Sequence, residues 1–577
     1  MKSFLAKMID RLSIGTFRRR LASIDSTPQF ALLGLASGIV TGLVVLAFRK
    51  MTEIPLESFL PGGADDFESL DWYYYFLCPF AGGLILAIYL MTVREGARSV
   101  GVVHVLERLA RHQGHLPARN LLVQFVGGII ALVSGQSGGR EGPAIHLGAA
   151  GSSLLGQYLN LPNNSIRILV GCGAAAAISA SFDTPIAGVI FSMEVIIMEY
   201  TVAGFIPVIL SSVVAALIIQ IFYGSVPAFD VPQVSMESFY DLPLVLVEGV
   251  LIGTIAALFV GSIKKLIQLA PSQAWLRMII AGTVTGILAL LVPQILGIGY
   301  DTVNSVLIGE FSFTALVAIC IFKILSTTVT ISMRMPIGVI GPTLFIGAAA
   351  GGIIWMTASS FIPGISSPAF YAILGMGAMM GAVLRAPLAA LMAVMEMTHN
   401  PNIILPAMLV IIIANITASE VFGQKSVFIT QMEMLGLEFR QNPMSMALNR
   451  ASVASIMARS FERVSSIVDR EQATELIGKG AHWLLVDVDK KPVFILRTED
   501  LRIFMDSHDA DEIDLEAIPA TRKDVSSILL QATLTEALDA LNSQGVQALY
   551  VNRIAAPMMD APVGIITRED IESYIQT

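Results

Sequence analysis

The sequence Gly-Arg-Glu-Gly-Pro-Ala-Ile-His-Leu-Gly-Ala-Ala-Gly occupies residues 139–151, and a related stretch, Gly-Val-Ile-Gly-Pro-Thr-Leu-Phe-Ile-Gly-Ala-Ala-Ala-Gly, occupies residues 338–351. Each copy is followed by a second landmark, a glutamate (Glu194 or Glu396) that stands nine positions after a proline. The equal spacing in both copies indicates an internal repeat rather than a chance match. Internal repeats in an apolar chain are typical of transport proteins that build a site between two halves near the midplane of a bilayer.

The composition places this repeat in a membrane. Of the 577 residues, 54% are hydrophobic and only 14% are charged, and the mean hydropathy is +0.71, which is too apolar for a soluble chain of this length. Segments long enough to cross a hydrocarbon core of about 30 Å are 28–48, 73–93, 203–223, 242–262, 276–296 and 311–332. Shorter segments, or segments broken by Gly and Pro, are 121–134, 144–158, 166–180, 184–198, 343–361, 368–383 and 387–397. Because broken helices at membrane depth survive where they line a cavity or are buried in protein, we expect the working site among them.

The N-terminal charges predict the orientation. Residues 1–27 hold six Lys and Arg against two Asp, and a basic segment beside the first span stays in the cytoplasm. No signal-peptide core precedes that span. We therefore expect an integral protein of an inner or plasma membrane with both termini in the cytoplasm. The net charge of −9 argues against a nucleic-acid partner.

Near residue 436 the composition changes from apolar to mixed. Short β-like runs then alternate with amphipathic segments, which predicts a soluble α/β domain. This part is repeated too, because PVFILRTEDLRIFM (492–505) matches PVGIITREDIESYI (562–575). In each copy an apolar run is followed by a polar turn and an aspartate, Asp500 or Asp570, at a helix start. Capping of the helix is the plainer interpretation of such an aspartate.

The glycine-flanked loops at 138–143 and 338–342 predict an anion site. Glycines ahead of a helix start expose backbone N–H groups, and these donors bind an anion together with the positive end of the helix dipole. In a single copy, the glycines would serve equally well for the close packing of membrane helices. Their equivalent positions in two repeats indicate that two helix N-termini converge on one anion.

Taken together, these features resemble the CLC family of chloride channels and proton/chloride exchangers. The resemblance rests on GREGP at 139–143, a GxFxP-like turn at 338–342, MEMT at 395–398 and the paired proline-to-glutamate segments. It implies an all-α polytopic membrane fold with an inverted repeat and broken helices, followed by a cytoplasmic α/β pair of cystathionine-β-synthase (CBS) domains. It also implies a homodimer with one anion pathway in each subunit. The implied parts are a basic segment 1–27, a transmembrane domain 28–435 and a CBS pair in 436–577, with units at about 450–506 and 519–577.

The resemblance assigns roles to individual residues. Glu141 corresponds to the gating glutamate, whose carboxylate competes with chloride and swings away when protonated; a carboxylate among N–H groups is itself a substitute anion. An ion pair between Glu141 and Arg140 is the structural alternative. The amides of Val339 and Ile340 correspond to those that hold the central anion. The implied anion-binding set is Gly139, Arg140, Glu141, Gly142, Val339, Ile340, Ser99, Val100 and Phe428.

Two positions of that set depart from the family pattern. If Gly101 anchors the turn that carries the anion-coordinating serine, the serine is replaced by Val100, whereas a shift of one residue would use Ser99. The tyrosine whose hydroxyl points at the central chloride corresponds to Phe428. Loss of both hydroxyls would leave the central anion held mainly by amides, so halide selectivity stays open.

A third departure concerns the mechanism. In the family's exchangers, the residue after the glutamate at position 194 is a second glutamate that passes protons from the cytoplasm, and here Glu194 is followed by Val195. Valine cannot carry a proton, so the sequence favours passive chloride conduction gated by Glu141. The alternative is a proton-coupled antiporter that uses Glu199, or water, as its internal proton route, since Glu199 would lie one turn beyond Val195 if the helix continues. Glu194 and Glu396 themselves are expected to hold helices together through hydrogen bonds.

The remaining ligand and function classes follow from the same patterns. In CBS domains the Thr and Asp of such a turn contact a nucleotide ribose, which implies Thr567 and Asp570 for ATP, ADP or AMP. Asp500 is the counterpart of Asp570 in the first unit, where Arg497 replaces the threonine. No catalytic or P-loop pattern is present and the histidines have no metal-like spacing, so we expect no enzyme, no metal and no required cofactor. A magnesium channel would place its CBS domains before the spans, and a purely regulatory nucleotide sensor would need no repeated loops.

Overall fold

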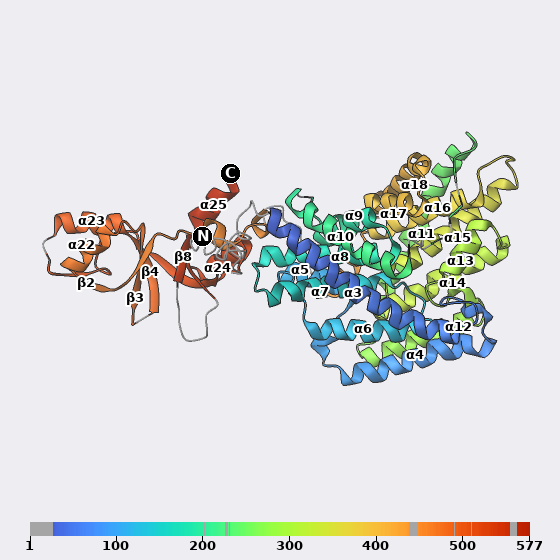
Figure 1. Cartoon of the computed structure of the whole chain (residues 1–577), viewed down its shortest axis with the longest axis horizontal. Coiled ribbons are helices and arrows are strands. Elements are labelled where there is room, and N and C mark those ends of the chain that lie inside the picture. The colour runs from blue at the N-terminus through green and yellow to red at the C-terminus, as the bar shows by residue number, and fades with distance from the viewer. Residues whose placement is uncertain are drawn as a thin grey trace, which may run out of the picture. The chain divides into compact units, whose positions relative to one another are not determined.

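The computed structural model describes residues 27–200, 202–224, 229, 231–232, 234–437, 447–489, 491–508, 510–553 and 562–576 (Figure 1). It divides into two compact units. One, the helical unit, comprises Phe30–Leu159 and Ile166–Phe439, and the other, the C-terminal unit, holds Arg440–Thr577. The change in composition near residue 436 predicts a division at this place. The basic segment 1–27, which carried the prediction of orientation, lies outside the described residues except for Thr27.

Eight helices of the described residues are long and apolar enough to cross a membrane. They are α3 (Thr27–Phe59), α4 (Trp72–Thr92), α8 (Asn163–Phe182), α10 (Val202–Tyr223), α11 (Asp241–Leu269), α14 (Phe313–Ser332), α15 (Ile340–Ser359), and α18 (Ile404–Ile416) with its flanking turns. Helix α3 continues beyond the expected end at residue 48 because Arg49 and Glu53 pair one turn apart, at 2.7 Å, so the charges do not end the helix. Helix α18 lies in a segment that the sequence analysis left unassigned.

Shorter helices complete the helical unit, and the expectation of an all-α membrane fold with short, broken helices is confirmed. They are α5 (Gly101–Arg111), α6 (Ala118–Val133), α7 (Glu141–Tyr158), α9 (Pro185–Phe191), the π-helical segment η3 (Ser192–Ile197), α12 (Ala274–Ala289), α13 (Tyr300–Ile308), α16 (Pro368–Leu384), α17 (Pro387–Thr398) and α19 (Val427–Met434). The duplicated sequence forms equivalent elements: α7, α8 and α9 with η3 in the first copy, and α15, α16 and α17 in the second.

Glutamates hold the two repeats together by a reciprocal exchange. The carboxylate of Glu194 accepts backbone N–H groups from the first turn of α17, at 3.3 and 2.9 Å. The carboxylate of Glu396 accepts N–H groups from the first turn of α9, at 2.8 and 2.7 Å. Each acid therefore satisfies the unpaired donors of the other repeat's helix start, and the prediction that both residues join helices is confirmed.

Glycines let the helices of each repeat approach closely. A Cβ atom added to Gly148 would lie 2.4 Å from the carbonyl oxygen of Gly173, and one added to Gly347 would lie 2.2 Å from that of Gly375. Such contacts leave room for no side chain, as is common between membrane helices. Helices α4 and α12 lie side by side for the same reason (Figure 1), because a Cβ atom on Gly282 would lie 2.3 Å from the carbonyl oxygen of Pro79.

The C-terminal unit is an α/β fold built from two copies of a β-α-β-β-α motif. A six-stranded sheet runs β1-β3-β4-β6-β7-β8, with β4 and β6 antiparallel at the junction of the copies. In each copy the first two strands are parallel and the last two antiparallel. The copies are β1 (Phe461–Ser465), α22 (Arg470–Gly478), β3 (Trp483–Val488), β4 (Lys491–Arg497), α23 (Thr498–Ser507), and β6 (Lys523–Leu529), α24 (Leu534–Gln544), β7 (Ala548–Asn552), β8 (Pro562–Thr567), α25 (Arg568–Gln576).

Candidate functional site: a carboxylate between two cavities

The two glycine loops meet through their backbones. The N–H of Gly139 donates to the carbonyl of Gly338 at 2.8 Å, and the N–H of Gly338 donates back to Gly139 at 2.7 Å, which makes an antiparallel bridge. A Cβ atom on Gly142 would lie 2.5 Å from the Cα atom of Gly338, so glycine is required at the contact. Because α7 begins at Glu141 and α15 at Ile340, the bridge brings two helix N-termini together, as the repeat predicts.

The side chain of Glu141 is fully buried at this junction. Its Oε1 accepts a hydrogen bond from the hydroxyl of Tyr300 at 2.5 Å, and its Oε2 accepts one from the N–H of Gly341 at 3.2 Å. Gly341 lies in the first turn of α15, where backbone N–H groups have no partner within the helix. The carboxylate of the first repeat thus occupies a donor of the second repeat's helix start.

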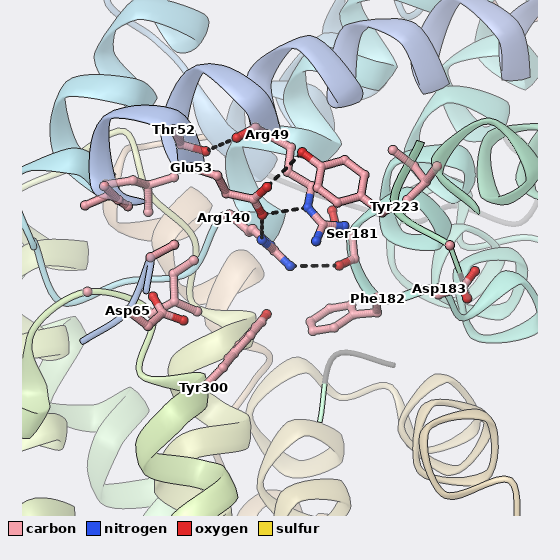
Figure 2. Close-up of a pocket in the computed structure, with 17 residues that line it drawn as sticks. Arg49, Thr52, Glu53, Asp65, Arg140, Ser181, Phe182, Asp183, Tyr223 and Tyr300 are labelled. Carbon is pink, nitrogen blue, oxygen red and sulfur yellow. Dashed lines mark hydrogen bonds and ion pairs between the residues drawn. The ribbon is translucent and has the colours of Figure 1, made fainter. Parts of the chain in front are cut away.

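Arg140 does not pair with Glu141, so the alternative prediction of an ion pair between these two residues is not met. Its Nη1 atom lies 2.9 Å from Oε1 of Glu53, and its Nη2 donates to the carbonyl of Ser181 at 3.3 Å. The guanidinium lies 5.4 Å from the centre of the Tyr300 ring. Figure 2 shows Arg140 between Glu53 on one side and Tyr300 on the other. Both oxygens of Glu141 are therefore left to Tyr300 and the backbone.

One cavity, of about 290 Å³, lies on the Arg140 side of Glu141 and is called the Tyr300 cavity below. Its walls come from α3, α10 and the loops before α7 and α13, and Figure 2 shows the polar side chains that face it. Glu53 also accepts from the hydroxyl of Tyr223 at 2.8 Å. The charged residues that line it are Arg49, Glu53, Asp65, Arg140 and Asp183.

A second cavity, of about 380 Å³, contains Gly142 in its wall and is called the Phe428 cavity. It brings together residues that the sequence analysis assigned from distant parts of the chain: Ser99, Val100, Gly142, Val339, Ile340 and Phe428. Of the other assigned residues, Arg140 lines the Tyr300 cavity, whereas Gly139 and Glu141 line neither. The carboxylate of Glu141 lies between the two walls, because it bonds Tyr300 of the Tyr300 cavity and the N–H of Gly341, which follows Ile340 of the Phe428 cavity. Charged residues around the Phe428 cavity are Glu95, Arg98, Glu107, Arg277 and Arg334.

The structure keeps both serine alternatives open. Gly101 has a φ of +80°, which glycine adopts readily, and it starts α5 directly after Ser99 and Val100. Both residues line the Phe428 cavity. The hydroxyl of Ser426 caps α19, and the buried Phe428 of that helix lines the cavity.

The proposed substitute proton carrier does not lie where the sequence analysis expected it. Val195 is buried in η3, but this segment ends at Ile197, and Met198 has a left-handed backbone with a φ of 56°. The helix does not continue, so Glu199 is not one turn beyond Val195 on the same helix. Both oxygens of Glu194 accept hydrogen bonds from α17.

Two groups of functional interest were missed. Tyr300 follows Gly299, which has a φ of +79°, so a Gly-Ile-Gly turn ahead of a polar aromatic is the one signal that could have pointed to it. His104 and His146 form a hydrogen bond of 2.9 Å between Nδ1 and Nε2. The spacing of the histidines tests them only as metal ligands, and nothing in a single sequence links residues so far apart.

In the C-terminal unit, the assigned pair forms a helix cap at the start of α25. Oδ2 of Asp570 accepts from both the N–H and the hydroxyl of Thr567 at 2.8 Å, and the Thr567 oxygen accepts from the N–H of Asp570 at 3.3 Å. This geometry is the helix cap that the sequence analysis gave as the plainer interpretation of Asp570. Asp500 lies in the first turn of α23, whose N-cap, Arg497, makes no side-chain cap. Beside the cap, a hydrogen bond from Lys523 and its positive charge lower the pKa of Glu569.

Comparison with known proteins identifies the family. The sequence profile described as "Voltage gated chloride channel" matches residues 82–419, and the chain belongs to this family. It is 31% identical over 403 residues to the "Putative chloride channel protein ClcB-like" of Ralstonia nicotianae, which covers 68% of this chain and 93% of that protein. It is 30% identical over 441 residues to the "H(+)/Cl(-) exchange transporter ClcA" of Citrobacter koseri, covering 73% and 92%.

Solved structures show the same fold. One is a slow cyanobacterial Cl−/H+ antiporter, with a TM-score of 0.61 and 22% identity, covering 70% of this chain and 98% of that chain. Another is a eukaryotic CLC transporter, with a TM-score of 0.58 and 18% identity, covering 96% of this chain and 98% of that chain. The second likeness includes the C-terminal unit, beyond the end of the family profile.

Proposed function

We propose that the chain is a proton-coupled chloride antiporter in which Glu141 gates an anion pathway between the Tyr300 and Phe428 cavities. The observation that carries this proposal is the seat of the Glu141 carboxylate. Between the two cavities, this carboxylate accepts hydrogen bonds from an N–H group in the first turn of α15 and from the hydroxyl of Tyr300. An anion that uses the Gly341 donor must displace the carboxylate, and protonation of Glu141 removes the competing charge.

Coupling to protons is supported by the relatives. The Citrobacter koseri relative is named a proton/chloride exchanger, and the cyanobacterial structure is that of an antiporter. Passive conduction, favoured by the sequence analysis, is the second candidate. Val195 and Phe428 favour it, as does the name of the Ralstonia nicotianae relative.

The remaining parts of the proposal concern direction and assembly. The Phe428 cavity would open to the cytoplasm, because its wall includes α19 and Leu435, where the chain leaves the helical unit. Three arginines against two glutamates in its wall would raise the local concentration of anions. We further propose a homodimer with one pathway in each subunit, and a CBS pair in the C-terminal unit that takes an adenine nucleotide at Thr567 and Asp570.

The test is transport by the full-length protein in liposomes under opposed chloride and proton gradients. An antiporter moves protons uphill as chloride runs down its gradient, whereas a channel moves chloride alone. Glu141→Gln is the informative variant, because an amide cannot exchange protons and should let chloride flow without proton movement. Absence of chloride flux in the wild-type protein would overturn anion transport, and chloride flux without proton movement would leave the channel.

A further inference from the structure

A buried pair of histidines connects the Phe428 cavity to the interior of α7. His104 lies on α5 and lines the cavity, and its Nδ1 atom is 2.9 Å from Nε2 of His146 on α7. The relative exposure of the two residues is 5% and 0%. At the far end of the pair, Nδ1 of His146 has no hydrogen-bond partner within the described part of the chain. A buried polar atom without a partner is costly and calls for an explanation.

The pair lies close to the segment that would otherwise carry protons. Helix α5 packs against α7 and also against η3, the segment that holds Val195. Val195 cannot bind a proton, and both oxygens of Glu194 are engaged by α17. Glu199 lies beyond the end of the helix. The histidine pair offers another route from the cavity toward Glu141.

The repeat shows that packing does not require an imidazole at position 146. Superposition of the GREGP and GVIGP sequences makes Glu141 equivalent to Ile340 and His146 equivalent to Phe345. Phe345 is buried in α15 and fills its place as an apolar ring. The first half of α7 thus carries two titratable residues whose counterparts in α15 are apolar. One of them is the proposed gate.

We propose that His104 and His146 form the proton route between the Phe428 cavity and Glu141, an inference that rests on the proposed antiport. A proton from the cavity binds Nε2 of His104, and the proton on Nδ1 of His104 passes to Nε2 of His146. The proton on Nδ1 of His146 then leaves toward Glu141. One proton enters and one leaves, no other bond is broken, and both rings end in the opposite tautomer. Before a second proton follows in the same direction, each ring turns about its Cβ–Cγ bond, a step that breaks only hydrogen bonds.

The surrounding charges suit transit rather than storage of a proton. On α5 itself, Glu107 and Arg108 follow His104, and the cavity wall adds Glu95 with three arginines, at 98, 277 and 334. An excess of positive charge disfavours a resting imidazolium. The last transfer spans five residues of α7, about 7.5 Å along the helix axis. A bridging water completes that step.

The experiment compares chloride and proton movement in liposomes that hold the full-length protein. His104→Gln and His146→Gln keep a polar side chain of similar size but cannot relay a proton. We expect chloride flux to persist in both variants while proton movement falls roughly a hundredfold, at the low end of what positioned proton-transfer groups contribute. His112→Gln, an exposed histidine that ends the same helix, is the matched control and should behave as the wild type.

The outcomes separate the two proposals. A wild type that moves chloride but never protons would overturn antiport and the relay with it. A wild type that couples, together with histidine variants that keep its proton-to-chloride ratio, would overturn the relay alone. Chloride flux in the same vesicles reports folding of each variant. If His146→Gln loses chloride flux as well, the ratio in His104→Gln, at the cavity wall, decides.

Discussion

The hydroxyl of Tyr300 can be removed almost without disturbing its surroundings. It donates to Oε1 of Glu141 at 2.5 Å. The ring is held separately, with centroids 4.8 Å from Phe229 and 6.4 Å from Phe182. Tyr300→Phe therefore deletes one hydrogen bond and leaves the packing in place. The loss is confined to the state in which the carboxylate of Glu141 sits between the two cavities.

The size of the effect follows from that single bond. A hydrogen bond to a charged group is worth about 1.5–3 kcal/mol, and each 1.4 kcal/mol is about a tenfold change in an equilibrium. The ratio of the state in which Tyr300 holds the Glu141 carboxylate to the state in which the carboxylate is released should therefore fall about 10- to 100-fold. Protonation removes the charge that these hydrogen bonds stabilise, so a carboxylate held by one bond fewer should be released at a lower proton concentration. The midpoint of chloride flux against pH should move upward by about one to two units.

Chloride efflux from liposomes, measured from acid to neutral pH, provides the assay. Tyr223→Phe is the matched control, because the hydroxyl of Tyr223 faces the same cavity but donates to Glu53 at 2.8 Å. We expect Tyr300→Phe to raise flux at neutral pH and Tyr223→Phe to leave the midpoint in place. Equal midpoints in the two variants and the wild type would refute the view that Tyr300 holds the gate.

Three further predictions concern the gate, the glycine bridge and the C-terminal unit. Glu141→Gln should raise anion flux and flatten its pH dependence, and a wild-type pH profile in efflux assays would contradict the gating role. Gly142→Ala places a methyl group 2.5 Å from the opposing backbone, so it should destabilise the fold by about 1–3 kcal/mol in thermal unfolding, whereas Gly96→Ala, which meets nothing within 4 Å, should not. Asp570→Ala should abolish binding of an adenine nucleotide in calorimetry on the full-length protein while Asp500→Ala preserves it; equal binding by both variants would remove the site.

The backbone part of the site could be predicted from the sequence because its glycine loop occurs in both repeats. Glycines at equivalent positions of two repeats indicated converging helix starts, and the bridge between Gly139 and Gly338 has that geometry. The role of Glu194 and Glu396 was predictable for the same reason. Hydropathy also located most of the long helices. It placed the ends of α3, α11 and α12 wrongly, counted α8 and α15 among the short or broken segments, and left α18 unassigned.

The side chains around the gate could not be predicted, because they come from segments without a shared pattern. Tyr300 is 159 positions from Glu141, and Glu53 is 87 positions from Arg140. No periodicity connects such residues. The end of η3 was equally hidden, since the left-handed residue that ends it is Met198. A methionine in that conformation is uncommon. Because no Gly or Pro stands at this position, the sequence did not indicate that the helix ends before Glu199.

In the proposed mechanism, the hydrogen bonds that hold Glu141 would link chloride to protons by whatever route the protons arrive. To vacate its place, a charged carboxylate must give up two donors in a buried site, and an unpaired buried charge is far more costly than a neutral acid. A chloride ion that accepts a hydrogen bond from the N–H of Gly341 gives that donor a new partner. The displaced carboxylate still has no donor. Departure is therefore easiest when a proton has arrived first. In this proposal an antiporter and a channel would share the gate, and the antiporter would require protons to reach Glu141 from both cavities. That difference makes the connection between the Phe428 cavity and α7 the decisive part of the molecule.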